Sequence, residues 1–194
     1  MIRCLFCLLM AMTLFACASV GSLEPVVANS INDGNTRRVL AVDRWHLVGR
    51  LSVRHGNQSW LSRVEWRHIK RLDVLTLSTS LGGVMAKLSF STDGVYLTNT
   101  DGYTRMITQV ELESLLGYSP PLQQLKYWVR GVADPAFGFI PHDFAVADGR
   151  GFEQTRWQIS LERYYRLDGL VLPKKIVAEK GDLKIKLMVD EWLS

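Results

Sequence analysis

The feature that most constrains the fold is a period-two alternation of apolar and polar side chains. Between Trp45 and Val53, large apolar residues alternate with His, Arg and Ser, and the alternation resumes between Trp60 and Trp66. Successive side chains of a β-strand point to opposite faces, so each segment predicts a strand with one apolar face. The intervening His55-Gly56-Asn57 predicts a turn that joins the two strands as an antiparallel hairpin.

Several further strands are predicted along the chain, separated by turn residues. The turns are expected at Asp93-Gly94, Asp101-Gly102, Asp168-Gly169 and Gly181-Asp182. The strands are expected over residues 72–78, 84–90, 95–98, 104–107, 144–146, 157–163, 172–178 and 183–189. About ten short strands at this spacing are typical of a curved antiparallel sheet or barrel.

Two helices are predicted near the middle of the chain. Thr108 and Glu111 form a capping box, Leu112, Leu115 and Leu116 follow at helical spacing, and Gly117 is placed to end the helix. The second helix is expected to start at Ser119-Pro120-Pro121 and to present one apolar stripe made of Leu122, Leu125, Trp128 and Val129 before Gly131. A helical hairpin is therefore expected to pack against the sheet.

The inward-facing positions of the sheet are large and apolar. They are Trp45, Leu47, Leu51, Val53, Trp66, Leu75, Leu77, Leu88, Phe90, Val95, Leu97, Trp157, Ile159, Ile185 and Leu187. The pattern is compatible with a solid core and with a ligand cavity. Taken alone it favours the solid core, because apolar stripes usually indicate packing.

The N-terminus carries a targeting signal. Residues 1–3 are a short cationic start, and the apolar segment 4–16 is shorter than the roughly 20 residues that span a bilayer. The segment ends Leu14-Phe15-Ala16-Cys17, which resembles the lipobox of bacterial lipoproteins. Residues 1–16 are therefore expected to be a signal peptide and Cys17 to carry lipid. The alternatives are a secretory peptide cut after Ala16 and an uncleaved apolar start.

The domain organisation follows from this signal. Residues 17–40 are expected to be the lipidated N-terminus and a flexible tether, and residues 41–194 a single β-domain. Ala18 follows the cysteine where an aspartate would favour retention in the inner membrane, so the outer membrane is the expected location. All three cysteines lie in the first 17 residues, which excludes a disulfide within the β-domain.

Catalytic and cofactor chemistry find no support in the sequence. The four histidines are scattered without metal-ligand spacing, and there is no Gly-x-Ser-x-Gly elbow, phosphate-binding glycine loop or thiol after Cys17. The 23 Lys and Arg residues are interleaved with 19 acids, so the net charge of +4 forms no basic run that could follow a nucleic acid. We expect no enzyme activity, metal, cofactor or nucleic-acid partner.

Taken in order, the motifs of the chain resemble the LolB family of outer-membrane lipoprotein receptors. The first motifs are the lipobox, Trp45-x-x-x-Gly49-Arg50, the tryptophans at positions 60 and 66, and Ser80-Leu81-Gly82-Gly83. The later motifs are Pro120-Pro121-Leu122-x-x-Leu125-x-x-Trp128-x-x-Gly131, Gln154-x-x-Trp157, Leu172-Pro173 and a closing Lys-rich strand with Trp192. The resemblance covers nearly all of the chain after the tether. It lies in the order and spacing of the motifs.

This resemblance implies a half-open, incomplete β-barrel with helices across its mouth and an apolar cavity for the acyl chains of cargo lipoproteins. It also implies a monomer, anchored by lipid on the periplasmic face of the outer membrane, that receives cargo from the carrier LolA. The residues expected to line the cavity are Leu47, Leu51, Trp66, Leu75, Leu77, Leu88, Phe90, Leu97, Leu116, Leu125, Trp128, Trp157, Ile159, Ile185 and Leu187. The alternative is an outer-membrane lipoprotein whose solid β core serves as a scaffold or assembly partner.

The segment Ser80-Leu81-Gly82-Gly83 has two interpretations. By pattern alone, Leu81 is a single exposed leucine of the kind found on any surface. The resemblance implies instead a protruding loop that inserts into the membrane, with Leu81 at its tip. Ser80 departs from the family, which commonly has proline there, and predicts a less rigid loop.

Overall fold

The computed structural model describes residues 25–26, 33–142 and 149–193. Its strands form one antiparallel sheet in the order β7-β6-β5-β4-β3-β2-β12-β11-β10-β9-β8, with β1 beside β10. The strands are β1 (Pro25–Val26), β2 (Arg44–His55), β3 (Gln58–Ile69), β4 (Leu72–Ser78), β5 (Val84–Ser91), β6 (Gly94–Thr98), β7 (Thr104–Ile107), β8 (Ile140–His142), β9 (Arg150–Gln154), β10 (Trp157–Leu167), β11 (Leu170–Lys180) and β12 (Leu183–Leu193).

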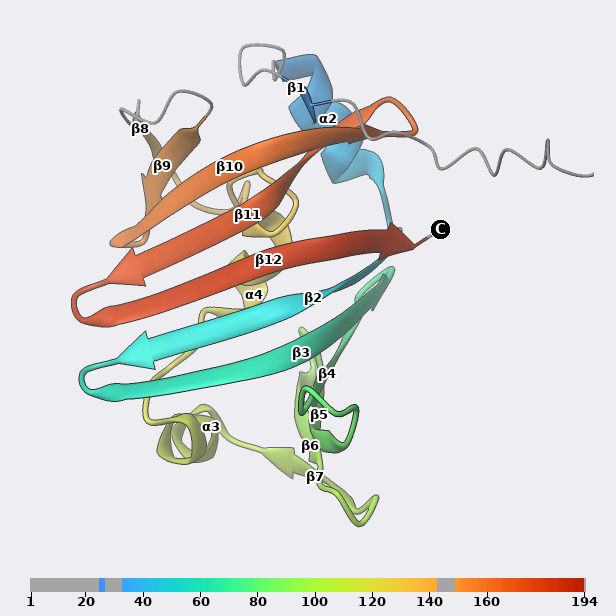
Figure 1. The fold of residues 1–194 in the computed structure, drawn as a ribbon, viewed down its shortest axis with the longest axis vertical. Coiled ribbons are helices and arrows are strands. Elements are labelled where there is room, and N and C mark those ends of the chain that lie inside the picture. Colours follow the sequence, from blue (N-terminus) through green and yellow to red (C-terminus); the bar gives the residue numbers. More distant parts are fainter. Residues whose placement is uncertain (1–24, 27–32, 143–148, 194) are drawn as a thin grey trace, which may run out of the picture.

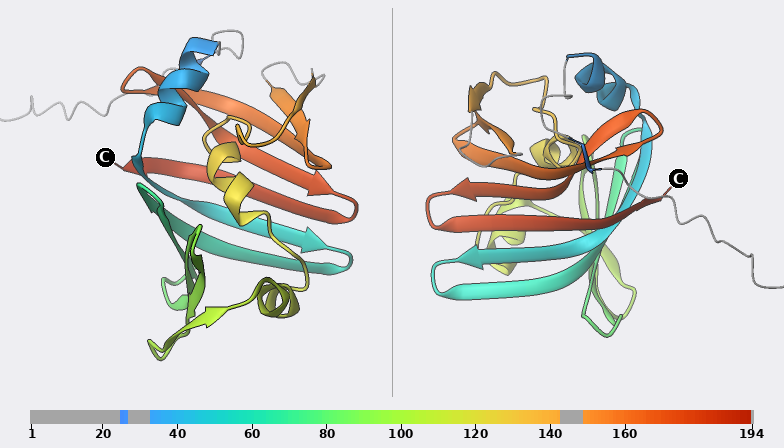
Figure 2. Two further views of the ribbon diagram at one scale, coloured as in Figure 1. Left: turned by 180° about the vertical axis from the view of Figure 1, so that it is seen from behind. Right: turned by 45° about the horizontal axis from the view of Figure 1, so that its top comes forward.

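The sheet curves so that helices cover its concave face. In the left-hand view of Figure 2, α3 (Gln109–Leu116) and α4 (Leu122–Trp128) lie on that face, while α2 (Asp33–Ala41) lies near one end of the sheet. The convex face is turned toward the reader in Figure 1. The predicted fold class, mainly β with a few helices and a curved antiparallel sheet, is confirmed.

The predicted hairpin of residues 45–66 forms. Leu47 faces Trp66 and Val53 faces Trp60 across β2 and β3, so these four residues share the concave face. Gly56 has φ +54 in the turn, a conformation that glycine adopts without strain. The remaining predicted strands also form, except that residues 144–146 lie outside the described residues.

Both predicted helices form, with one difference in what they bury. The Thr108 hydroxyl accepts a hydrogen bond from the Glu111 N–H, the Glu111 carboxylate accepts one from the Thr108 N–H, and Gly117 ends α3 at φ 75. Leu112 is buried and Leu116 half-buried, but Leu115, which was expected on the packed stripe, is exposed. An eight-residue helix at the margin of the sheet buries one side alone.

The prediction of a flexible tether up to residue 40 is wrong over its last part, because residues 33–41 form α2. The Asn35 side chain donates to the Val171 carbonyl at 3.0 Å and accepts from the Val171 N–H at 2.8 Å. Val39, in the same helix, is also buried. These contacts order the chain from residue 33, so the folded domain begins before residue 41. The signal peptide and Cys17 lie outside the described residues.

Three strands of the described chain, β1, β8 and β9, are not predicted by the alternation. β9 reads Arg-Gly-Phe-Glu-Gln and contains a single large apolar residue, so it shows no apolar stripe. None of the helices in the described ranges combines the length and hydropathy that crossing a membrane requires.

Candidate functional site

The concave face of the sheet is a continuous apolar surface. Every residue that was expected to line a cavity belongs to it or packs directly against it. The buried members of that set are Leu47, Trp66, Leu75, Leu88, Phe90, Trp128, Trp157, Ile159, Ile185 and Leu187, and the half-buried members are Leu51, Leu77, Leu97, Leu116 and Leu125.

Burial on this face is uneven along the strands from β2 to β6. Antiparallel pairing turns the β2–β3, β4–β5 and β6–β7 connections toward one end of the sheet, which we term the open end, although β4 stops opposite Arg63 and its loop lies short of the β2–β3 turn. On β2, Leu47 is completely buried, Leu51, nearer the open end, is half-buried, and Val53, nearer still, is buried again. On β4, Leu75 is buried and Leu77 is half-buried. Trp60, at the open end of β3, is 43% exposed. Apolar surface is therefore accessible at the open end.

The connection between α3 and α4 lies at the open end as well. The Tyr118 ring, two residues after α3, lies 6.4 Å from the His55 ring in the β2–β3 turn. Burial raises the pKa of the Tyr118 hydroxyl to about 12, so it stays neutral at physiological pH. Leu116 and Leu125 are half-buried on either side of this connection. Together with the neutral Tyr118 they add uncharged, mostly apolar surface to the open end.

The opposite end of the concave face is filled by aromatic rings. The Trp45 ring lies 5.4 Å from Trp66, 5.2 Å from His68 and 5.6 Å from Trp192. Trp66 also packs edge-on against Phe90 at 5.9 Å. Such aromatic pairs bury large areas in fixed geometries, so this end of the interior is closed.

A buried polar group lies among these rings and was not predicted. Asp73 accepts a hydrogen bond from the Trp66 indole at 2.8 Å, and His68 Nδ1 lies 2.9 Å from the same carboxylate oxygen. The position of Asp73 in alternation with Leu75 and Leu77 is the one sequence signal that it faces inward. Because polar groups are costly to bury unpaired, these contacts fix the side chains at the closed end.

Arg130, another buried residue that sequence reasoning missed, joins α2 to the segment after α4. Its guanidinium donates to the carbonyls of Val39 at 2.9 Å and Val42 at 3.3 Å, and it lies 5.6 Å above the Trp45 ring. Burial lowers the pKa of Arg130 to about 10, which still leaves it charged at neutral pH. A cation at the last carbonyls of α2 also complements the helix dipole.

Gln154 holds the position of α4 over the sheet. Its side-chain oxygen accepts from the Trp128 indole at 2.8 Å and from the Asp134 N–H at 2.9 Å, and its nitrogen donates to the carbonyls of Asp134 and Phe137. Gln154 is nearly completely buried. The Gln154-x-x-Trp157 motif pointed to this residue without indicating what it does.

The structure places Leu81 at the tip of a tight loop between β4 and β5. The Thr79 N–H donates to the Gly83 carbonyl at 2.8 Å, and the Thr79 hydroxyl accepts from the Gly83 N–H at 3.1 Å. Gly82 has φ +92, which suits glycine at this turn. Ser80 and Gly83 are exposed, and Leu81 is 97% exposed. Thr79 closes the loop, so proline at position 80 is not needed to form it.

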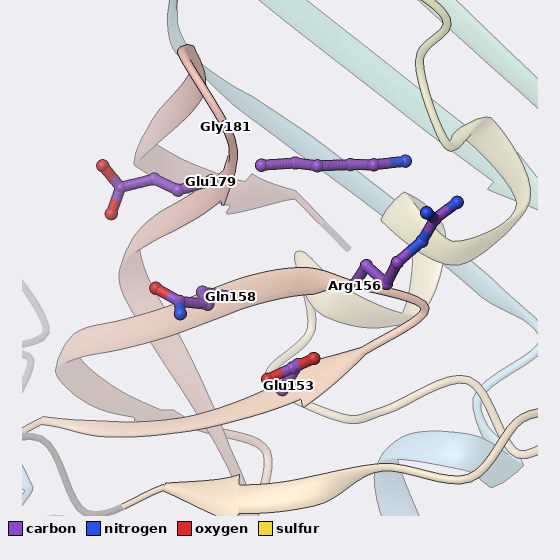
Figure 3. Close-up of a pocket in the computed structure, with 6 residues that line it drawn as sticks. Glu153, Arg156, Gln158, Glu179 and Gly181 are labelled. Carbon is purple, nitrogen blue, oxygen red and sulfur yellow. The ribbon is translucent and has the colours of Figure 1, made fainter.

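The larger surface hollows do not suit an acyl chain. Figure 3 shows one of about 410 Å³ on the convex side, lined by Glu153, Arg156, Gln158, Glu179, Lys180 and Gly181. Its lining is polar and contains both signs of charge. Within the described residues, no group of three or more His, Cys, Asp or Glu side chains could hold a metal ion.

Comparison with known proteins agrees with this geometry. The chain is 28% identical over 151 residues to the outer-membrane lipoprotein LolB of Azoarcus sp. (strain BH72), covering 77% of this chain and 78% of that one. It is 28% identical over 200 residues to the outer-membrane lipoprotein LolB of Alkalilimnicola ehrlichii, covering 98% and 96%.

Solved structures show the same fold at low sequence identity. A LolA superfamily protein from Nitrosomonas europaea aligns with a TM-score of 0.51 at 9% identity, covering 86% of this chain and 93% of that chain. Residues 43–192 match the family model described as outer membrane lipoprotein LolB. The chain therefore belongs to the LolB family.

Proposed function

We propose that this protein is an outer-membrane receptor that accepts lipoproteins from a LolA-like periplasmic carrier and delivers them into the outer membrane. The observation that carries the proposal is the combination of an accessible apolar face with an exposed leucine on a projecting loop. The concave apolar face is accessible at Trp60 near the open end, and the β4–β5 loop with the exposed Leu81 points toward the same end of the strands. Acyl chains could enter and leave where the loop meets a bilayer.

The physical basis of transfer is the exchange of one apolar environment for another. Each buried methylene of an acyl chain contributes about 0.8 kcal/mol, so a chain is strongly bound by any matching apolar surface. Net movement from carrier to receptor then requires a difference in affinity, without nucleotide hydrolysis. No bond is made or broken, so the proposed function needs no catalytic residue, cofactor or metal.

The proposal includes an anchor. Residues 1–16 are removed as a signal peptide, and Cys17 carries lipid that holds the domain on the periplasmic face of the membrane as a monomer. Several acyl chains on one cysteine would make this anchor effectively permanent. Intact-mass analysis of the membrane-extracted protein should show loss of residues 1–16 and a gain of acyl mass. Retention of Met1 would contradict the anchor.

The function is tested by scoring acceptance and release separately. Purified carrier loaded with a lipoprotein is mixed with the receptor, first without vesicles and then with them. We expect cargo to move to the receptor in the first step and to vesicles in the second. If cargo stays on the carrier in the first step, the domain is not a receptor, and the alternative of a solid scaffold with buried Leu47, Phe90 and Ile159 is favoured.

A further inference from the structure

The convex face carries a basic patch that the proposed function does not use. Strand register places three rows side by side across β12, β2 and β3, and we term these positions the basic outer patch. The rows are Lys184, Arg54 and Ser59, then Lys186, Ser52 and Leu61, then Met188, Arg50 and Arg63. None of these positions carries an acidic side chain.

Part of this positive charge has no acidic partner. Arg50 pairs with Asp190 at 2.7 Å, and Lys184 pairs with Glu179 at 2.7 Å. Within the described part of the chain, no ion pair is found for Arg54, Arg63 or Lys186. A hollow of about 270 Å³ lies over the patch, lined by Ser52, Arg54, Ser59, Lys184 and Lys186. Hydroxyl and cationic donors around one hollow suit an anionic oxygen group such as a phosphate.

The basic outer patch joins the base of the Leu81 loop. Arg63 is the register partner of Ser78, and Ser78 is the partner of Val84, so this row of the patch continues to both ends of the loop. Leu61, within the patch, is 74% exposed, and Val84 is 51% exposed. In the right-hand view of Figure 2, β3 and the hairpin of β4 and β5 together form the lower boundary of the molecule. One surface can therefore meet the patch and the loop at once.

We propose that the basic outer patch binds the headgroups of anionic phospholipids and lays this side of the domain against the bilayer while Leu81 inserts. This inference rests on the proposed function, because the β4–β5 loop must meet the bilayer. Exposed aliphatic side chains beside unpaired cations are the composition of a surface that lies in a membrane interface. A bilayer is favoured over an acidic protein because the patch adjoins Leu61, Val84 and Leu81. Their exposed aliphatic surfaces suit the acyl region beneath the headgroups.

The test measures docking of the lipid-anchored full chain on vesicles. An environment-sensitive fluorophore at Ser59→Cys reports contact between the patch and the bilayer, and the chain without this substitution gives the background. We expect the emission to rise in vesicles that contain phosphatidylglycerol and not in phosphatidylcholine alone. Each Lys or Arg near an anionic membrane surface adds to the binding free energy. Removing three of them in the triple variant Arg54→Gln, Arg63→Gln, Lys186→Gln should therefore weaken docking on the order of 100-fold.

A matched triple variant controls for net charge. Arg38→Gln, Arg71→Gln and Arg166→Gln remove the same charge from exposed positions outside the patch, and we expect them to leave docking unchanged. Raising the salt concentration from about 0.01 M to about 1 M shortens the Debye length from about 30 Å to about 3 Å and should release the patch.

Three results would overturn the inference: equal emission in neutral and anionic vesicles, equal loss in both triple variants, or a rise caused by the carrier alone. The last would assign the patch to an acidic protein surface. Failure of the receptor function is distinguishable from these, because it shows as absent cargo acceptance in the vesicle-free step, which does not depend on docking.

Discussion

At the scale of single residues, Leu81 is the side chain whose exposure most needs an explanation. It is 97% exposed at a loop closed by hydrogen bonds of Thr79. Insertion of one leucine contributes about 1.5 to 3 kcal/mol, so Leu81→Glu should slow cargo release by about 10- to 100-fold. It should change the free energy of unfolding by less than about 0.5 kcal/mol and leave acceptance intact, because the side chain has no packing to lose. Separate assays of acceptance, release and urea unfolding check this.

Val110→Glu is the matched control for Leu81→Glu, since Val110 is 77% exposed on α3. It introduces the same charge at another apolar surface position and should leave release unchanged. Release by Leu81→Glu at the wild-type rate would show that Leu81 is an ordinary surface leucine.

Gln154 is the residue on which we expect stability to depend most among the buried polar groups. Gln154→Leu would leave the Trp128 indole and the Asp134 N–H without their acceptor, at about 1 to 3 kcal/mol for each unsatisfied group. We therefore expect the free energy of unfolding to fall by about 2 to 6 kcal/mol in denaturant titrations. Gln158→Leu, on an exposed position of β10, is the control and should cost less than about 0.5 kcal/mol. Equal destabilisation by Gln154→Leu and Gln158→Leu would show that the buried hydrogen bonds of Gln154 do not stabilise the fold.

At the scale of elements, α3 depends on its N-terminal cap. The Thr108 N–H and then the Arg105 side chain bond the Glu111 carboxylate and lower its pKa below the ordinary 4.5. A lowered pKa stabilises the fold above the ordinary value, and this stabilisation is lost as the pH falls below it. The stability difference between wild type and Glu111→Gln should therefore shrink on acidification.

Thr108→Ala, which removes the side-chain cap of the same helix, should lower the free energy of unfolding by about 1 kcal/mol. Thermal unfolding across pH, with Glu113→Gln as control, measures both, and a pH-independent difference would contradict the role of the carboxylate.

The elements also show which parts of the fold a sequence can predict. The hairpin of β2 and β3 and the capping box of α3 were predictable because each carries its own local pattern. By contrast, α2 has the polar sequence Asp-Gly-Asn-Thr-Arg-Arg-Val-Leu-Ala, and it is held by Asn35 bonding a strand 136 residues away. The inward strand faces were likewise predictable, but the sequence does not show that Val53 is buried while its cross-strand partner Trp60 is 43% exposed. Local periodicity carries no information on such distant contacts.

At the scale of the whole molecule, the question is whether the interior binds acyl chains or is a solid core. A ligand that binds the native state alone raises its stability, by about 2.7 kcal/mol at a concentration of 100 times Kd. A palmitoylated peptide at submicellar concentration should therefore raise the unfolding temperature by several degrees, about 2 to 4 °C per kcal/mol for a domain of this size. The peptide without its acyl chain is the control. An unchanged unfolding temperature with both peptides would favour the scaffold alternative.

The strand order ends at β7 on one side and β8 on the other. In a closed barrel the number of strands and their stagger fix the radius, so the interior volume is fixed once the strands have paired. A sheet with two edges is free of that constraint and can widen or tighten through changes in twist while every ladder hydrogen bond is kept. The space on the concave side of the sheet would then vary with the curvature of the sheet. For the receptor proposed above, such a sheet would let one set of apolar side chains hold acyl chains of unequal bulk and pack together again after they leave.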